Sequence, residues 1–254
     1  MKLPLRKVRV LGYDVIDEAP SRIAVAVCDE MRTGESRSYF FLNPHSIVQA
    51  TRDAELQRCF TQDAELFCDG VGLSLANRLL NGRPLQRFCG PDFFLAISQE
   101  MSGRRYGRVF FLGGHGDVID SLMSKFRREF AGVEAVAAYS PAFKPEFSSA
   151  DVADMAARIM AFRPDALWIG VGSPKQEKLL RELQALCKVP CAGAIGAVFD
   201  FYCGRVTLGP KWVRDVGLLW AYRLIQEPRR LWRRTFISAP LFVLRVCREL
   251  GRPS

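Results

Sequence analysis

Apolar positions along the chain recur with two spacings that alternate. Seven short stretches are rich in β-branched or aromatic residues, which is typical of strands. They span residues 22–29, 36–43, 65–70, 108–114, 133–140, 164–172 and 189–201. Six longer stretches place apolar residues three or four positions apart, which is typical of helices that bury one face. They span residues 46–61, 72–82, 90–103, 117–132, 149–164 and 173–188. The alternation predicts an α/β fold with a largely parallel sheet flanked by helices.

Two turns rich in glycine follow predicted strands and precede predicted helices. The first holds Gly113 and Gly114, and the second holds Gly172. Glycine lets the backbone approach a ligand closely, and the N–H groups at a helix start suit a phosphate at this edge of a parallel sheet. Plain tight turns are the alternative. An NAD-dependent oxidoreductase would also use such turns, but neither turn completes the dinucleotide-binding fingerprint.

The charge divides the chain into two parts. The 254 residues are 49% hydrophobic, enough for one large domain with a buried core. From Arg205 onward there are eleven Lys and Arg residues and three acidic residues, so residues 1–204 carry little of the formal net charge of +9. We therefore predict an α/β domain over residues 1–204 and a basic, amphipathic appendage over residues 205–254.

The basic appendage also holds three of the four tryptophans. Pro228 can open a helix on which Arg229 and Arg230 lie four residues before Arg233 and Arg234. Arginine and tryptophan on an amphipathic helix suit an anionic membrane surface. A solvated basic face whose aromatic residues pack on the body is the alternative. A nucleic-acid-binding protein is another, but the nearly neutral body argues against it.

The cysteines and the N-terminal residues bear on the compartment. Eight cysteines include no CxxC pair, and the chain has two histidines, so a zinc site is poorly supported and reduced, buried cysteines are expected. The first residues lack the apolar core of a secretory signal, and no apolar run approaches the ~20 residues that span a bilayer. These features favour a cytoplasmic protein.

Four stretches, taken together and in this order, resemble the WecG/TagA/CpsF glycosyltransferase family. They are LFCDGVGLSLANRLL, VFFLGGHGDVID, PDALWIGVGSPKQEKLL and the segment that runs from GAIGAVFDF through YRLIQEPRRLWRRT. The resemblance covers roughly residues 38 to 236. It implies a Rossmann-like core with a basic C-terminal appendage that contacts the membrane. It also implies transfer of a sugar, with inversion, from a nucleotide-sugar donor, usually a UDP-sugar, to a polyprenyl-diphosphate-linked saccharide at the inner membrane face.

The resemblance places the chemistry of the reaction on particular residues. The proposed catalytic aspartate of the family falls on Asp69, where a carboxylate could take the proton of the acceptor hydroxyl or merely cap a helix. Asn43 matches an asparagine near the sugar site. Phe41 stands where many members have threonine, which leaves open whether the donor is an N-acetylmannosamine derivative or another sugar such as UDP-glucose. His45 could contact the acceptor or act as a second base, although a surface residue at a helix start is the simpler interpretation.

The turn that contains SPKQE can be interpreted in the same terms. Ser173 and the N–H groups of the helix start could bind the donor phosphates, while Gln176 and Glu177 hydrogen-bond sugar hydroxyls. Lys175 could neutralise charge on the leaving diphosphate. A capped helix with i, i+4 ion pairs is the alternative, and we prefer it for Lys178.

The remaining predicted contacts come from three regions. By resemblance Asp200, at a strand end, would contact uridine, and Tyr139 would stack or hydrogen-bond nearby. No Asp-x-Asp pair occurs in the sequence, so we expect neither a metal nor a cofactor. Cationic side chains would then close over the diphosphate of the donor or of the lipid acceptor. The candidates are Arg214, Arg223, Arg230 and Arg233. Leu219 stands where many members carry a glutamate. The sequence does not determine the oligomeric state, and a homo-oligomer is possible.

Overall fold

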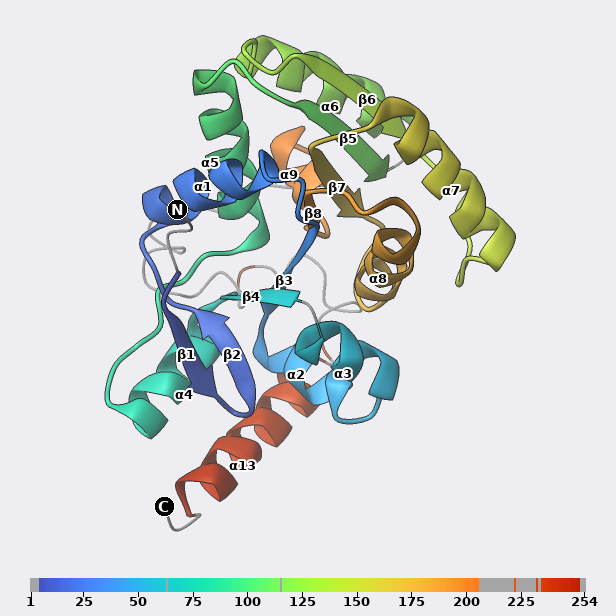
Figure 1. The fold of residues 1–254 in the computed structure, drawn as a ribbon. Helices are drawn as coiled ribbons and strands as arrows, with labels where there is room; N and C mark the ends of the chain where they lie inside the picture. The colour runs from blue at the N-terminus through green and yellow to red at the C-terminus, as the bar shows by residue number, and fades with distance from the viewer. Residues whose placement is uncertain are drawn as a thin grey trace.

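A computed structural model describes residues 5–62, 64–114, 116–205, 222, 232 and 234–251. The strands of this part of the chain form one sheet in the order β1-β2-β4-β3-β8-β7-β5-β6 (Figure 1). They are β1 (Lys7–Val10), β2 (Tyr13–Ile16), β3 (Arg37–Leu42), β4 (Ala64–Cys68), β5 (Arg108–Gly113), β6 (Ala135–Tyr139), β7 (Ala166–Gly170) and β8 (Cys191–Ala194). β1 pairs with β2 in an antiparallel manner, and the other pairs are parallel. The prediction of an α/β fold with a largely parallel sheet is confirmed.

The helices cover both faces of this sheet. They are α1 (Pro20–Met31), α2 (Pro44–Ala50), α3 (Ala54–Thr61), α4 (Val71–Asn81), α5 (Gly90–Gly103), α6 (Gly116–Glu129), α7 (Ser149–Phe162), α8 (Lys175–Cys187), α9 (Val198–Tyr202), the π-helical turn η1 (Arg234–Ser238) and α13 (Ala239–Leu250). Crossovers between parallel strands are right-handed, so the direction of a connection along the sheet decides which face of the sheet its helix covers. Connections that run toward β6 place α1, α5 and α6 on one face, whereas those that run toward β1 place α2, α3, α7 and α8 on the other.

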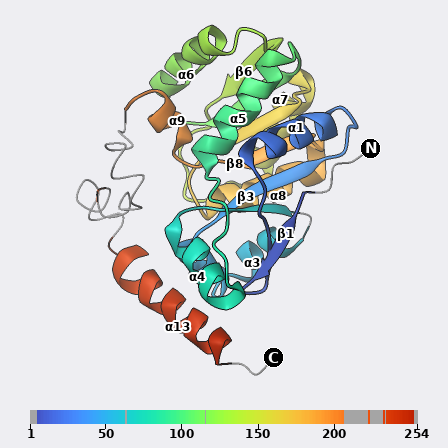
Figure 2. The same ribbon diagram turned by 90° about the vertical axis from the view of Figure 1, so that its left-hand side faces the viewer.

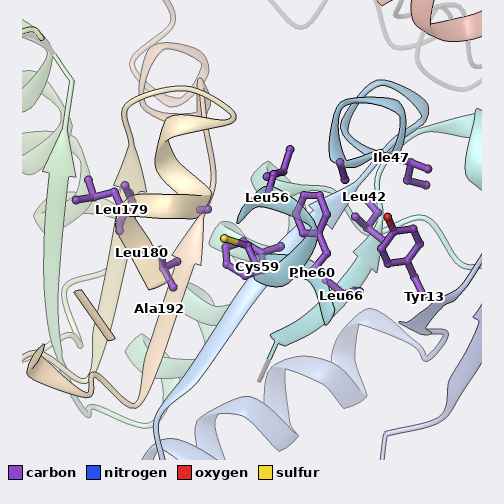
Figure 3. Packing of buried hydrophobic residues seen from close by; sticks show 14 of the residues in the cluster. Tyr13, Leu42, Ile47, Leu56, Cys59, Phe60, Leu66, Leu179, Leu180 and Ala192 are labelled. Carbon is purple, nitrogen blue, oxygen red and sulfur yellow. The ribbon is translucent and has the colours of Figure 1, made fainter. Parts of the chain in front are cut away.

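The side chains of each strand alternate between two buried clusters. Phe110 and Leu112 of β5 face the cluster beneath α2, α3, α7 and α8, whereas Val109 and Phe111 face the cluster beneath α1, α5 and α6. Figure 3 shows part of the first cluster, where Phe60 lies among residues of α2, α3, β3 and β4. The alternation follows from the two-residue period of a strand that is buried on both sides.

The directions in which the chain leaves the strands determine where a site can form. The chain leaves the carboxyl ends of β3 and β8 toward opposite faces, because α2 and α9 lie in different clusters. It does so again at the neighbouring strands β5 and β7, which lead to α6 and α8. Ligands of doubly wound sheets bind at such switch points. Asn43 and the two glycine turns lie at these ends.

Three local predictions were wrong. Residues 22–29 form most of α1 rather than a strand, because Pro20 opens a helix whose buried residues recur at helical spacing against α5. Residues 46–61 form two helices, since Asp53 caps a new helix, α3. In residues 189–201 the strand ends at Ala194, and Gly196, with a φ of 66°, turns the chain into α9.

The predicted basic appendage is described in its last part, from residue 234 to residue 251. There α13 packs against α2 and α4, as Figures 1 and 2 show. Phe242 and Val246 are buried in the cluster that also contains α8, and Arg245 Nη2 donates a hydrogen bond to Leu11 O across 2.9 Å. α13 therefore contributes to the core of the α/β domain.

Candidate active site

The carboxyl ends of β3 and β4 bring Asn43 and Asp69 together. Leu42 lies beside Cys68 in this parallel pair, so the residue that follows each strand reaches the same edge of the sheet. Asn43 Nδ2 donates a hydrogen bond to Asp69 Oδ2 across 3.2 Å. The Asp69 N–H donates to Leu42 O across 2.8 Å. Both side chains are half-buried, so a ligand at this edge can reach a carboxylate whose position is fixed.

The amide of Asn43 has only one orientation that fits its surroundings. Asn43 is the N-cap of α2, and its Oδ1 accepts hydrogen bonds from the N–H groups of His45 and Ser46, each across 3.1 Å. Because the helix occupies the oxygen, the amide nitrogen faces Asp69. The N-cap position of α4 is Gly70, so Asp69 lies one residue before it. The role of Asp69 as a base stays a prediction.

The segment between α4 and α5 adds groups near Asp69 that the sequence did not single out. Arg87 forms an isolated β-bridge with Cys68, the residue before Asp69. The Asp69 carboxylate also lies close enough to Cys89 to raise its pKa, although burial is the larger cause. In the sequence, Arg87 is a cation three residues before Gly90, the first residue of α5, and this position alone did not indicate a role in the site.

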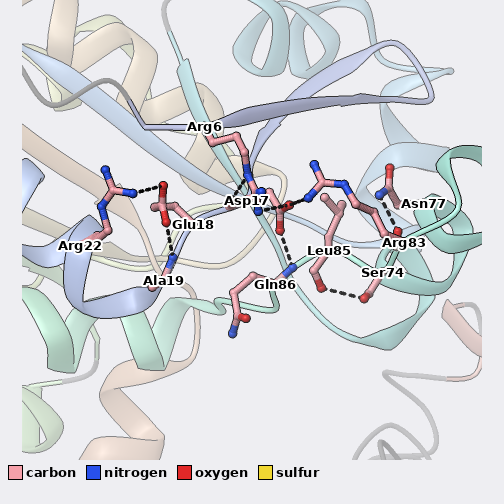
Figure 4. A network of polar contacts seen from close by, with 10 residues as sticks. All are labelled: Arg6, Asp17, Glu18, Ala19, Arg22, Ser74, Asn77, Arg83, Leu85 and Gln86. Atoms are coloured by element: carbon pink, nitrogen blue, oxygen red, sulfur yellow. Dashed lines mark hydrogen bonds and ion pairs between the residues drawn. The ribbon is translucent and has the colours of Figure 1, made fainter.

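A buried aspartate anchors this segment to the N-terminal hairpin (Figure 4). Asp17 is 2% exposed. Its Oδ1 accepts from the Gln86 N–H across 2.7 Å, and its Oδ2 contacts Arg6 at 2.8 Å and Arg83 at 3.1 Å. The network fixes the backbone one residue before Arg87, so β1 and β2 support the site from outside.

The two glycine turns lie against each other at the ends of β5 and β7. The Gly114 N–H donates to Gly170 O across 3.3 Å. A Cβ on Gly113 would lie 2.6 Å from Gly170 O, so Gly113 is required for close packing of the two turns. A Cβ on Gly172 would meet nothing within 4 Å, but Gly172 has a φ of 85°, a conformation that favours glycine. Phosphate binding by these turns stays a prediction.

The side chains of Gln176 and Glu177 are buried where α8 approaches the end of β8. Gln176 Nε2 donates to Ala194 O across 3.2 Å and to Glu177 Oε1 across 3.1 Å. A backbone carbonyl can only accept, so the Gln176 amide nitrogen faces β8 and its oxygen points away. Gln176 Oε1 and Glu177 Oε2 are buried and have no hydrogen-bond partner among the described residues. Burial raises the pKa of the Glu177 carboxyl to about 7, while hydrogen bonds from Gln176 and Ser173 oppose the increase.

The two lysines in the first turn of α8, Lys175 and Lys178, have structural contacts. Lys175 Nζ donates to Lys144 O across 2.6 Å and lies 4.5 Å from the centre of the Phe147 ring. Lys178 forms ion pairs with Asp53 and Glu55 at 2.8 and 3.1 Å. Lys178 therefore pairs with acids of α3 rather than with acids of its own helix, and no side chain caps α8.

His45 links the site to the C-terminal residues. Its Nδ1 lies 2.8 Å from Ser238 Oγ at the end of η1. Burial lowers the pKa of His45, and the nearby Arg234 guanidinium lowers it further. The simpler interpretation of His45 was a surface residue at a helix start. In the structure it is at a helix start, but it is half-buried between α2 and η1.

Asp200 and Tyr139 lie on elements other than those that lead to Asn43 and Asp69. Asp200 lies in the first turn of α9, not at a strand end as predicted, because β8 stops at Ala194. Tyr139 ends β6, and three strands separate β6 from β3. The Arg158 guanidinium lies 4.2 Å from the centre of the Tyr139 ring. This contact gives Tyr139 a structural role.

Comparison with known proteins identifies the family. The model of the "Glycosyl transferase WecG/TagA/CpsF family" matches residues 8–254. This chain belongs to the WecG/TagA/CpsF glycosyltransferase family. A relative from Bacillus subtilis (strain 168) is 29% identical over 208 residues, which are 82% of this chain and 78% of the relative. One from Bacillus spizizenii (strain ATCC 23059 / NRRL B-14472 / W23) is 30% identical over 208 residues, 82% of this chain and 77% of the relative. Both are named N-acetylglucosaminyldiphosphoundecaprenol N-acetyl-beta-D-mannosaminyltransferase.

In this WecG/TagA/CpsF glycosyltransferase, part of the predicted site lies outside the described residues. That part comprises Arg214, Arg223, Arg230 and Arg233. Within the described residues, no group of three or more His, Cys, Asp or Glu side chains is arranged to hold a metal ion. Nor does any described helix have the length and apolar character that a membrane span requires.

Proposed function

We propose that this glycosyltransferase moves a hexose or an N-acetylhexosamine from a UDP-sugar to a saccharide carried on polyprenyl diphosphate, in the synthesis of a surface polysaccharide. The observation that carries the proposal is the pair of Asn43 and Asp69 at the ends of two parallel strands. A carboxylate held by a neutral amide, and half-open to solvent, is suited to accept a proton from a sugar hydroxyl. The names of the two Bacillus relatives support the classes of donor sugar and acceptor.

The proposed reaction is a direct displacement at the anomeric carbon of the donor. Asp69 takes the proton of the acceptor hydroxyl while that oxygen forms a bond to the anomeric carbon. The bond from this carbon to the UDP oxygen breaks, and UDP leaves with the electron pair. Asn43 keeps one carboxylate oxygen of Asp69 in place, which limits the reorganisation needed as the proton moves. Attack from the side opposite UDP inverts the anomeric configuration.

The donor phosphates are placed at the glycine turns of β5 and β7. Gly114 and Gly172 lie just beyond the carboxyl ends of these strands, and α8 begins directly after the second turn. Backbone N–H groups at such a position suit a diphosphate. We expect the arginines of the appendage, which lie outside the described residues, to offset the negative charge that develops on the leaving UDP.

The amide of Gln176 supports a role in sugar recognition. Its oxygen has no partner among the described residues, while both hydrogens of its nitrogen are used by Ala194 and Glu177. A ligand group that binds this side chain must therefore donate a hydrogen bond, as a sugar hydroxyl does.

Phe41 is the reason why the proposal leaves the donor sugar open. Its ring packs against Phe67 and Phe93 at centroid distances of 5.8 and 5.6 Å, so an aromatic cluster occupies a position where many family members carry a hydroxyl. A donor other than an N-acetylmannosamine derivative is consistent with that change. The proposal therefore covers hexoses and N-acetylhexosamines alike.

The acceptor places the enzyme at the inner face of the cell membrane as a peripheral protein. The carrier lipid stays in the bilayer, and a basic appendage that carries most of the net charge would attract anionic lipid. This position agrees with the relatives, whose names specify an undecaprenol-linked acceptor.

A panel of UDP-sugars tests the proposed function. Each donor is incubated with a synthetic acceptor that carries N-acetylglucosamine on a lipid diphosphate, and products are identified by mass spectrometry and by the anomeric coupling in NMR. Transfer of one sugar with inversion is the expected result. Retention of configuration, or no transfer from any UDP-sugar of the panel, would overturn it.

A further inference from the structure

A pocket next to the candidate base has a lining that the reaction as proposed does not use. It has a volume of about 340 Å³ and lies between α2 and η1. Pockets of ~300–1,000 Å³ hold small organic ligands. Residues of its wall include His45, Val48, Arg52, Trp232, Ile237 and Ser238.

One residue of the pocket wall is hydrogen-bonded to Asn43. His45, in its wall, donates its backbone N–H to Asn43 Oδ1 across 3.1 Å, and Asn43 in turn holds Asp69. On the other side, His45 Nδ1 lies 2.8 Å from Ser238 Oγ, which ties α2 to η1. A ligand in the pocket would therefore contact His45, which is two residues after Asn43 in the sequence and is hydrogen-bonded to it.

The chemistry of the wall is that of an amphipathic ligand. Val48, Trp232 and Ile237 offer apolar surface, while Arg52 is exposed and supplies a positive charge. His45 is half-buried in the wall and lies 2.8 Å from Ser238 Oγ, so its ring is held in place. An apolar interior with a cation at its rim fits a hydrocarbon chain that ends in phosphate.

The surface beside the pocket is also apolar. Phe236 is 66% exposed and adjoins Ile237, which is 39% exposed, in η1. Leu244, in α13, is also exposed. A hydrocarbon chain that leaves the pocket can follow these residues toward a bilayer without returning to water.

We propose that this pocket binds the isoprenoid units next to the diphosphate of the lipid acceptor, with Arg52 facing the diphosphate. The proposal rests on the proposed function for the identity of the acceptor. It assigns acceptor specificity to α2 and η1, and it explains why a C-terminal element packs beside the base. The occupant is the carrier lipid itself rather than the bulk membrane.

Two soluble acceptors separate the pocket from the rest of the site. Both carry N-acetylglucosamine diphosphate, one on a two-carbon chain and one on a ten-carbon chain, and both are used below the micelle concentration without vesicles. For the unmodified enzyme we expect a KM for the ten-carbon acceptor at least about tenfold lower, since burial of a few methylene groups suffices for that preference. Equal KM values for the two acceptors would overturn the proposal.

Two matched variants locate the preference. Ile237→Glu places a charge in the wall and should abolish the preference for the longer chain. Val243→Glu places the same charge at an exposed position of α13 that does not line the pocket, and should keep the preference. If both variants lose it equally, the preference comes from a general apolar surface and the pocket proposal is wrong.

A binding measurement keeps the two proposals distinguishable. Decyl diphosphate is titrated into each protein without donor, by calorimetry. Binding by the unmodified enzyme and by Val243→Glu, but not by Ile237→Glu, supports the pocket even if no UDP-sugar is transferred, in which case the proposed function fails. Transfer without preference for chain length, and no binding of decyl diphosphate, leaves the function standing and removes the pocket.

Discussion

Asn43 uses one atom of its amide to cap α2 and the other to hold Asp69, so a single side chain links the start of a helix to the candidate base. The two roles are coupled, because the helix N–H groups fix which atom faces the carboxylate. Any change at residue 43 therefore alters both the stability of α2 and the geometry of Asp69.

Replacing the candidate base should separate chemistry from binding. Asp69→Asn keeps the shape of the side chain but removes its capacity to accept a proton, so we expect turnover to fall by about two or more orders of magnitude. The KM for the UDP-sugar and the unfolding midpoint should change little. Steady-state kinetics measures turnover and KM, calorimetry measures UDP binding, and thermal unfolding measures the midpoint. Turnover close to that of the unmodified enzyme would remove Asp69 from the role of base.

Removing the Asn43 side chain should affect both stability and rate. Asn43→Ala loses the cap of α2, which should lower the free energy of unfolding by about 1 kcal/mol, and it should also lower kcat because Asp69 loses its hydrogen bond. Urea unfolding and kinetics measure the two effects.

The structure offers a matched control for this substitution. Asp53 caps α3 in the same way, with its Oδ1 accepting from the N–H groups of Glu55 and Leu56. Asp53→Ala should cost at least as much stability, because it also loses the ion pair with Lys178, while kcat stays normal. If the two variants lower kcat equally, the effect of Asn43 is one of stability alone.

The alternation of strands and helices predicted the sheet, but it could not resolve segments whose local pattern is ambiguous. Ile23, Val25 and Val27 alternate with alanine as in a strand, yet contacts with α5 select the helix α1. The hairpin of β1 and β2 was missed because its turn, Leu11 and Gly12 with φ of 50° and 89°, lacks the usual Asn-Gly signal.

The candidate site was predictable only in part, for a similar reason. The resemblance pointed to Asn43 and Asp69, and the parallel register of β3 and β4 explains why they meet. The contacts of Gln176 with Ala194 and of His45 with Ser238 join residues far apart in the sequence. No local pattern encodes such contacts, since they depend on how the helices pack on the sheet.

Asp17 should be important for stability although it lies outside the candidate site. Asp17→Ala removes the hydrogen bond to the Gln86 N–H and two ion pairs from a buried position, so we expect a loss of about 2–4 kcal/mol in the free energy of unfolding. Asp14→Ala removes an ion pair with Arg9 in which both side chains are exposed, and should cost less than ~1 kcal/mol. Urea unfolding compares the two. Equal losses would show that the buried network contributes no more than a surface pair.

Chelation tests how charge on the leaving diphosphate is neutralised. The sequence has no Asp-x-Asp pair, and its basic appendage offers arginines that can take the place of a metal ion. We therefore expect activity to persist after treatment with EDTA and dialysis, and to fall as salt screens the arginines. Complete loss of activity that manganese restores would contradict this expectation.

Glu177 should make the stability of the protein depend on pH. Burial raises the pKa of its carboxyl from the ordinary value of 4.5 to about 7, so the folded protein retains a proton that the unfolded chain has lost. Stability is therefore highest below about pH 4.5 and declines as pH rises toward 7, by up to ~3 kcal/mol in the free energy of unfolding. Glu177→Gln cannot ionise and should lack this component, which makes it more stable than the unmodified protein at pH 8. Urea unfolding between pH 5 and pH 8 measures the difference, with Glu134→Gln, at an exposed position, as the control. If Glu177→Gln and Glu134→Gln show the same dependence on pH, the Glu177 carboxyl ionises in the folded protein as it does in water, and its burial has no energetic consequence.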